Sequence, residues 1–522
     1  MRSFSQEKIF ILVLILFSIS INQYYGNRGV FPIDSFYSFD AAHNIIFGNH
    51  PFKDYWTVTG PFVDYIQSLF FLTFGINWVS YVLHASIINM ILTLFSFYLF
   101  LNIGLKNYYA FIYALGVAIL AYPTIGTPFV DQHSVIFSTM ACFSFSLAIL
   151  KNKKIFWILI PIFITFSFFS KQIPSAYFII LFSFIIPIYF FMLNEVNRNA
   201  LLNLILGCFI SFLMVASIFL INKIPLENFF IQYIFYPLSI GETRINKLGI
   251  NFHNLVSQFK FIYFAIIPLV ISTFFLSRIK DKNLDNKKDF IVSLLFFASI
   301  GIFIYYQMLT KNQILIFFLI PVVVAYSHAY TIKYFNKKYL IYFILAIFIF
   351  TTTKYHLRFN QNRKFIELPR VDFNLAEKAD LLDKRLKGLK WITPDYPKQP
   401  LTEINLLIEI KNILSEKKEQ KIIITDYRFF TALVNNKFAS PNKWYDTLSI
   451  PDKKNKYYEV HKKFFLNKIK ENEIQYLFFI GNKNQMYFFE EFLNENKCIA
   501  SHQFNELLLE FDISKCKLKK VT

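Results

Sequence analysis

The chain has 522 residues, of which 55% are hydrophobic and only 17% are charged, and its formal net charge is +20. An ordinary soluble protein carries about 25% charged residues, and apolar runs such as Phe156–Phe169 and Ala176–Leu193 approach the ~20 residues that cross a bilayer. The composition therefore excludes a soluble globular protein and predicts a polytopic helical membrane protein.

The positive charge does not indicate a nucleic-acid partner. Basic residues before Lys354 lie mostly in short segments between apolar runs, and later ones are mixed with acidic residues. Nucleic-acid binding would need a basic face with stacking aromatic residues. Four cysteines are too few for a disulfide framework. Cys498 and Cys516 either pair, if their segment lies outside the cytosol, or stay as free thiols.

The first apolar run, Ile9–Ile21, follows Arg2 and Lys8. No small-x-small cleavage site comes after it, so we expect a retained signal-anchor helix rather than a cleaved signal peptide. With this run the hydropathy predicts about eleven spans. The others are expected at residues 78–102, 108–122, 133–150, 155–170, 173–193, 200–222, 260–277, 289–309, 312–330 and 339–353. The apolar segment Gly60–Phe74 ends at Gly75 and is expected to be a membrane-surface helix.

The short loops predict the orientation. If the N-terminus is cytosolic, the cytosolic loops hold more basic residues than the outer ones, including the cluster between Arg278 and Lys288, as the positive-inside rule requires. An odd number of spans then places the tail outside. We therefore expect a multi-pass plasma (inner) membrane protein with a cytoplasmic N-terminus and an extracytoplasmic, periplasmic tail.

The tail is predicted to be a separate α/β domain. Lys421–Tyr427 and Gln475–Ile480 are typical of buried strands, and Tyr458–Asn472 has helical spacing. The expected fold is thus mainly α, with a transmembrane catalytic domain over residues 1–353 and a soluble α/β domain over residues 354–522. Lys354–Phe373 would link them.

The segment Phe31–Pro61 is the first polar region after the first span, and it is rich in acids and aromatic residues. Acids at a bilayer surface are functional candidates by default. Asp34 is expected to start a surface helix over Ser35–Phe47 that Gly48 ends. The alternative role for these two residues is structural, because Asp is a common N-cap and Gly a common C′ residue.

The pattern P-x-D-S-x-Y from Pro32, followed by Gly48, P-F-x-D and Gly60-Pro61, resembles the first outer loop of GT-C superfamily glycosyltransferases. Those include protein O-mannosyltransferases and lipid A aminoarabinose transferases. The resemblance implies a polyprenyl-phosphate-sugar donor, a membrane-lipid environment and a catalytic acid in this loop. Ser35 stands where some members carry a second acid, which leaves open which acid is the base.

The expected chemistry requires a base for the acceptor hydroxyl and cations for the departing phosphate. Asp34 is the candidate base. Asp131 in the next outer loop resembles a second GT-C acid, and His133 beside it is counted as substrate-binding. The alternative for this pair is an Asp N-cap with a surface histidine. Lys171 and Arg244 are candidate phosphate ligands, with an interfacial snorkelling role as the alternative for Lys171 and an ordinary aromatic belt as the alternative for the loop around Arg244.

The remaining polar residues of the first loop receive weaker roles. Asp54 and Asp64 are supporting carboxylates, with Asp54 counted as substrate-binding. Asp40 is expected to be solvated, and His43 and His50 to be surface residues. Asp131 and His133 alone do not make a metal site, so no metal is assigned and a divalent cation stays an option.

The sequence thus favours an inverting glycosyltransferase that moves a sugar from a polyprenyl-phosphate donor to a glycan, lipid or protein acceptor on the outer face. A glycan polymerase, ligase or flippase is the first alternative, although the predicted spans carry few of the charges that a flippase path needs. The second alternative is a non-catalytic membrane scaffold. Function would require Asp34, Asp131, Lys171 and Arg244 to converge on one pocket.

Overall fold

The computed structural model describes most of the chain. The described ranges are residues 6–193, 197–246, 248–278, 284–311, 313–335, 337–435, 440–446, 448–481 and 500–516. The side chains of residues 242–244, 313, 314, 500, 501 and 515 are also outside the description.

Eleven apolar helices make up a bundle, and each matches one of the predicted spans. They are α1 (Gln6–Gly26), α5 (Trp78–Asn102), α6 (Asn107–Leu120), α7 (Val130–Lys151), α8 (Lys154–Ser170), α9 (Gln172–Leu193), α10 (Arg198–Ile221), α13 (Lys260–Arg278), α14 (Leu284–Thr310), α15 (Leu319–Tyr330) and α16 (Lys338–Tyr355). In the described part of the chain, eight helices are long and apolar enough to cross a membrane, whereas α6, α8 and α15 are shorter. The predicted polytopic helical bundle is confirmed.

The bundle is built around α7, because 94% of the residues in its apolar 18-residue stretch are buried. In α10 that share is only 11%, so this helix lies at the periphery. The exposed face of α10 is apolar, as expected for a helix that faces lipid. Gly207 lets α10 approach α8 closely, because an added Cβ would lie 2.4 Å from the carbonyl oxygen of Ile158. Small residues commonly permit such close contacts between membrane helices.

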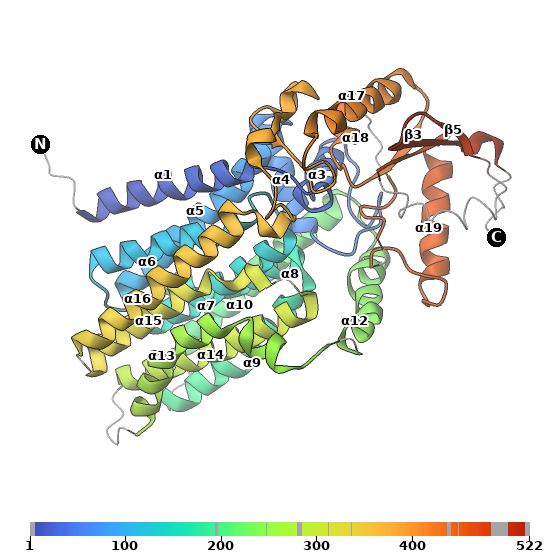
Figure 1. Cartoon of the computed structure of the whole chain (residues 1–522). Coiled ribbons are helices and arrows are strands. Elements are labelled where there is room, and N and C mark those ends of the chain that lie inside the picture. Colours follow the sequence, from blue (N-terminus) through green and yellow to red (C-terminus); the bar gives the residue numbers. More distant parts are fainter. Residues whose placement is uncertain are drawn as a thin grey trace, which may run out of the picture.

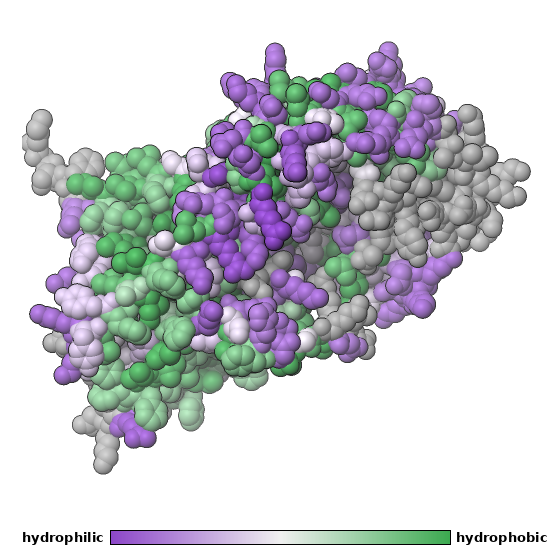
Figure 2. Space-filling view, in the orientation of Figure 1, coloured by the Kyte–Doolittle hydropathy of each residue, from purple (hydrophilic) through white to green (hydrophobic). Residues whose placement is uncertain are grey.

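The N-terminus and the C-terminal tail lie at opposite ends of the bundle (Figure 1). Figure 2 shows apolar side chains over the helices and hydrophilic ones over the tail. The end of the bundle that carries the tail is called the tail end below. It also carries the segment between α1 and α5, and α12 (Tyr236–Asn246) (Figure 1).

The segment after α1 contains three helices. They are α2 (Pro32–Ser35), α3 (Phe39–Ile46) and α4 (Pro61–Phe74). The predicted helix Gly60–Phe74 is confirmed, and Gly48 follows α3 at a φ of +83° as expected for a C′ glycine. The predicted continuous helix Ser35–Phe47 is wrong, because a turn at Phe36–Ser38 separates α2 from α3. Phe36 is fully buried there between Trp78 and Phe429, so tertiary packing overrides helix continuity.

The segment 223–259 is largely helical. It contains α11 (Leu226–Phe229), η2 (Phe230–Phe235), α12 and η3 (His253–Ser257). Tyr233 is fully buried and stacks on Phe169 at the end of α8. The Gln232 side chain donates to the carbonyl of Phe52. This segment therefore packs against the first loop at the tail end.

The link between α16 and the tail is anchored. It runs through η6 (His356–Gln361) and η7 (Lys364–Ile366). Between them, the buried Arg363 guanidinium donates to the carbonyls of Pro123 and Ile125 at 2.8 and 2.7 Å, and to that of Arg28 at 3.2 Å. One side chain thus satisfies backbone acceptors of two loops, which fixes the tail relative to α1 and α7.

The tail contains a small α/β fold, as predicted. Its elements are β1 (Glu377–Lys378), β2 (Lys390–Trp391), α17 (Pro400–Glu416), β3 (Lys421–Thr425), α18 (Phe430–Leu433), α19 (Tyr458–Glu471), β4 (Tyr476–Ile480), β5 (Ala500–Gln503) and β6 (Leu508–Asp512), with short 3-10 turns η8 (Phe373–Leu375), η9 (Ala379–Leu381), η10 (Lys384–Leu386) and η12 (Ile513–Lys515). The sheet has the order β3-β4-β6-β5, with β3 and β4 parallel. Both predicted strands are confirmed. Cys516 is disulfide-bonded, Cys142 and Cys208 are free, and Cys498 lies outside the described residues.

The tail shares a hydrophobic core with the first loop. Phe36, Phe39 and Trp78 belong to the same buried cluster as Trp391 and Phe429 of the tail. Isolated β-bridges join Arg28 to Lys390 and Trp56 to Asn442. The first loop is therefore enclosed between the bundle and the tail.

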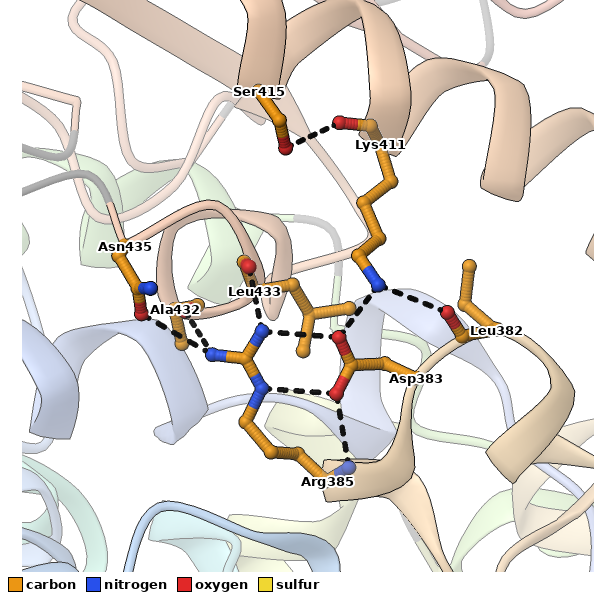
Figure 3. A network of polar contacts seen from close by, with 8 residues as sticks. All are labelled: Leu382, Asp383, Arg385, Lys411, Ser415, Ala432, Leu433 and Asn435. Atoms are coloured by element: carbon orange, nitrogen blue, oxygen red, sulfur yellow. Dashed lines mark hydrogen bonds and ion pairs between the residues drawn. The ribbon is translucent and has the colours of Figure 1, made fainter.

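Helix α18 is held at both ends. At its start, the Asp40 carboxylate of α3 accepts the backbone N–H groups of Thr431 and Ala432 at 3.3 and 3.0 Å. At its end, the Arg385 guanidinium donates to the carbonyls of Ala432 and Leu433 (Figure 3). Asp383 accepts from Arg385 and Lys411, and these partners hold the pKa of its carboxyl well below the ordinary value despite burial. The expectation that Asp40 is solvated is wrong, because the tail supplies partners that lie hundreds of residues away.

Candidate functional site

Asp34 lies in the first loop at the tail end of the bundle. Its backbone N–H donates to the carbonyl of Phe31, and the Ser35 hydroxyl accepts from the Phe31 N–H, so α2 is closed on itself. The Asp34 carboxyl is partly buried. Within the described part of the chain, no hydrogen bond or ion pair reaches its oxygens. The side chain is therefore not occupied by the helix-capping role that the sequence also allowed.

The environment of Asp34 disfavours its charge. Burial is the largest cause, and the neighbouring charges of Asp131 and Glu367 add to it, so the pKa of the Asp34 carboxyl is raised to about 7. The Arg428 guanidinium of the tail acts in the opposite direction. A carboxyl with this pKa and no hydrogen-bond partner is suited to take a proton near neutral pH.

A triad of Asp131, Lys171 and Tyr306 lies close enough to Asp34 for the charge of Asp131 to act on its carboxyl. Lys171 Nζ contacts both oxygens of the Asp131 carboxylate, at 2.6 and 2.7 Å. The Tyr306 hydroxyl of α14 donates to the same carboxylate. The Asp131 side chain is 3% exposed, whereas that of Lys171 is 18% exposed. An ammonium has three N–H donors, so Lys171 keeps one for a further partner.

The backbone around Lys171 is tied to the first loop. Lys171 closes α8, and its N–H donates to the carbonyl of Ser167. The Gln172 side-chain amide donates to the carbonyls of Val58 and Tyr233, at 2.7 and 2.8 Å. Lys171 is thus positioned by α8, the first loop and η2. Asp34, Asp131 and Lys171 all lie at the tail end.

His133 does not join this group. Its side chain is fully buried and contacts the Tyr122 hydroxyl, and its Nε2 lies 3.0 Å from Nε2 of His84 on α5. His84 in turn contacts the side-chain oxygen of Gln67. Residues two apart on a helix face different neighbours, so His133 points toward α5 while Asp131 points toward α14. The alternative of a surface histidine is also wrong, since His133 lies inside the bundle.

Asp54 also has a partner elsewhere. Its carboxylate accepts the backbone N–H of His50 at 2.8 Å and lies 3.8 Å from Lys468 Nζ on α19. It therefore closes its own loop and faces the tail.

The Arg244 side chain lies outside the described residues. Among the loop histidines, His43 is 1% exposed rather than at the surface.

Asp64 forms the most buried ion pair of the described chain. Both of its oxygens contact Lys443 Nζ, at 2.7 and 2.6 Å, and the side chains are 0% and 3% exposed. Lys443 also lies over the Tyr37 ring, 4.0 Å from its centroid. Burial lowers the pKa of Lys443 to about 8 and raises that of Asp64. This contact joins the first loop to the tail.

Sequence reasoning missed the partners of these acids. Tyr306 ends an apolar run in the pattern Ile-Tyr-Tyr-Gln, and polar residues at the end of a span were an available signal. Lys443 and Arg428 stand among many charged tail residues without a distinguishing pattern. In the described part of the chain, no group of three or more His, Cys, Asp or Glu side chains is arranged to hold a metal ion.

Comparisons with known proteins give a distant likeness in structure. No family model matches the sequence, and no curated protein matches it. Among solved structures, the chain is similar to ArnT from Cupriavidus metallidurans in the apo state. The TM-score is 0.43 and the sequence identity 10%, over 96% of this chain and 97% of that chain.

Proposed function

We propose that the chain is an integral-membrane glycosyltransferase that moves a sugar from a polyprenyl-phosphate donor to an acceptor hydroxyl. The observation that carries the proposal is the gathering of an unpaired carboxyl, Asp34, with the buried Asp131–Lys171 pair at the tail end of the bundle. The resemblance of the first loop to GT-C enzymes implies a catalytic acid in the same loop.

The reaction needs one proton acceptor and one cation. In the proposed step, the acceptor oxygen attacks the anomeric carbon and its proton passes to the Asp34 carboxylate. The bond between the anomeric carbon and the phosphate oxygen breaks, and its electron pair leaves with polyprenyl phosphate. Attack opposite the leaving group inverts the anomeric configuration. A general base of this kind contributes about 10²–10⁴-fold to the rate.

Lys171 is the proposed cation for the departing phosphate. The Asp131 carboxylate holds its ammonium in place, and Tyr306 holds that carboxylate. The Lys171 side chain is 18% exposed and keeps one donor. A fixed cation aimed at developing charge stabilises a transition state, because no reorganisation is needed during the reaction. Asp131 is thus a positioning residue in this scheme.

The proposed topology puts this site on the outer face of the plasma membrane. The lysine-rich loops follow α7, α13 and α15, whereas the first loop and the tail share the other end (Figure 1). The positive-inside rule makes the end of the bundle that carries the lysine-rich loops cytosolic. The disulfide at Cys516 supports the same orientation, because disulfides persist in oxidising compartments.

Replacing Lys171 with Gln is expected to reduce kcat for sugar transfer by about 10²–10³-fold, the usual effect of losing one transition-state charge contact. The measurement is release of polyprenyl phosphate by the purified variant. Lys468→Gln is the matched control, since Lys468 contacts Asp54 and Glu471 away from the triad. Unchanged kcat in Lys171→Gln would remove this lysine from the reaction.

The rate should depend on pH through Asp34. Since the pKa of Asp34 is raised to about 7, the base is protonated at lower pH and deprotonated above it. We therefore expect kcat/KM for the donor to rise tenfold per pH unit on the acidic side and to level off above pH about 7.5. A profile that is flat from pH 5 to 8 would contradict the assignment.

A further inference from the structure

A small cavity, lined mostly by residues with polar side chains, lies between the first loop and the tail. Its volume is about 40 Å³, and its walls come from α3 and the segment around Tyr55 on one side and from residues of the tail on the other. A single water needs only about 10–15 Å³ by this measure. The cavity therefore has room for a small polar group.

The walls present hydrogen-bonding atoms without partners. They are Nε of Arg428, Nδ2 of Asn442, the Tyr55 hydroxyl and Oδ1 of Asn44. All four residues are at most 6% exposed. An unpaired buried polar group destabilises the folded state, so four of them around one cavity indicate an occupant. Three can donate a hydrogen bond, and one accepts.

The charges in the wall also favour an anion. Lys443 is paired with Asp64, and the Asp40 carboxylate is occupied by two backbone N–H groups of α18. Arg428 donates to the carbonyl of Lys443 and stacks on Trp444, 3.6 Å from the ring centroid. The charges of Asp426, Asp446 and Asp40 act on Arg428, but none of the ion pairs found among the described residues includes its guanidinium. A buried guanidinium of this kind is stabilised by an oxyanion, whose geometry its planar N–H groups match.

We infer that the cavity between the first loop and the tail is an oxyanion-binding site that takes a phosphoryl group. Donors from Arg428, Asn442 and Tyr55 would surround the phosphoryl oxygens. The side-chain carbonyl of Asn44 would accept a hydrogen bond from a hydroxyl of the phosphoryl group. The occupant would bridge the bundle and the tail. This site is separate from the Asp131–Lys171 pair, and it does not depend on the proposed sugar transfer.

The test uses the full chain in dodecyl maltoside micelles and titrates it calorimetrically with inorganic phosphate, with chloride at matched ionic strength as reference. We expect phosphate to bind and chloride not to bind. Tyr55→Phe removes only an unpaired hydroxyl, so it should leave the melting temperature in chloride unchanged and weaken phosphate binding about tenfold. Tyr65→Phe is the matched control, because Tyr65 contacts His50 outside the cavity.

A second variant, Arg428→Lys, keeps the charge and loses the Nε–H donor, so it should also weaken phosphate binding.

Glycerol 3-phosphate distinguishes the source of the ligand. Tighter binding than inorganic phosphate identifies the phosphate ester of a larger molecule, and weaker binding identifies free phosphate. Equal binding of phosphate and chloride by the wild type, or unchanged phosphate binding in both Tyr55→Phe and Arg428→Lys, would overturn the inference.

Discussion

Replacing Asp34 with Asn should lower sugar transfer by at least about 10³-fold, within the range that a general base contributes. At neutral pH the Asn amide cannot take up the proton of the acceptor hydroxyl. The amide has nearly the same size and shape as the carboxyl that it replaces. The measurement is release of polyprenyl phosphate by the purified variant at pH 8, where the wild-type carboxyl is ionised.

The same variant should fold at least as well as the wild type. A carboxyl whose folded pKa is raised from its ordinary value near 4 to about 7 destabilises the folded state progressively as pH rises between those values, and the cost persists above pH 7. Asp34→Asn removes this cost, so its melting temperature at pH 8 should equal or exceed that of the wild type. Near-normal transfer by a folded Asp34→Asn variant would eliminate Asp34 as the base.

Breaking the buried Asp64–Lys443 pair should be the most destabilising single change at the junction of first loop and tail. Lys443→Met leaves the Asp64 carboxylate buried without a partner, which typically costs about 3–5 kcal/mol. The double variant Asp64→Leu with Lys443→Met removes both charges and should recover most of that loss. Melting temperature and hydrogen exchange in β3 and α18 report the two effects.

Glu471→Gln is the matched control for this experiment, because the Lys468–Glu471 pair is exposed and such pairs contribute about 0–1 kcal/mol. Equal destabilisation by the single and the double variant at Asp64 and Lys443 would show that packing, rather than an uncompensated charge, holds the junction.

Long apolar runs and local patterns predicted the elements of the fold. The spans, the helix of Pro61–Phe74 and the strands β3 and β4 follow from composition and periodicity, which are properties of neighbouring residues. The break at Phe36–Ser38 could not be predicted in this way. It depends on the burial of Phe36 against residues of α5 and the tail.

The placement of the candidate residues could be predicted in part for the same reason. Asp34, Asp131 and Lys171 stand next to predicted span ends, so they were expected at one surface, and the structure gathers them there. Asp64 and Lys443 are 379 residues apart, and no local pattern links them. His133 was misjudged because adjacency to Asp131 in sequence does not give adjacency in space on a helix.

Release of polyprenyl phosphate tests the central claim most directly. The purified chain in proteoliposomes is incubated with a panel of polyprenyl-phosphate hexoses and pentoses that carry a radiolabel in the lipid, together with cell-envelope extract as the source of acceptor. We predict that at least one donor yields free polyprenyl phosphate with the wild type and none does with Asp34→Asn. Equal release by both folded proteins, or no release from any donor by the folded wild type, would contradict the account.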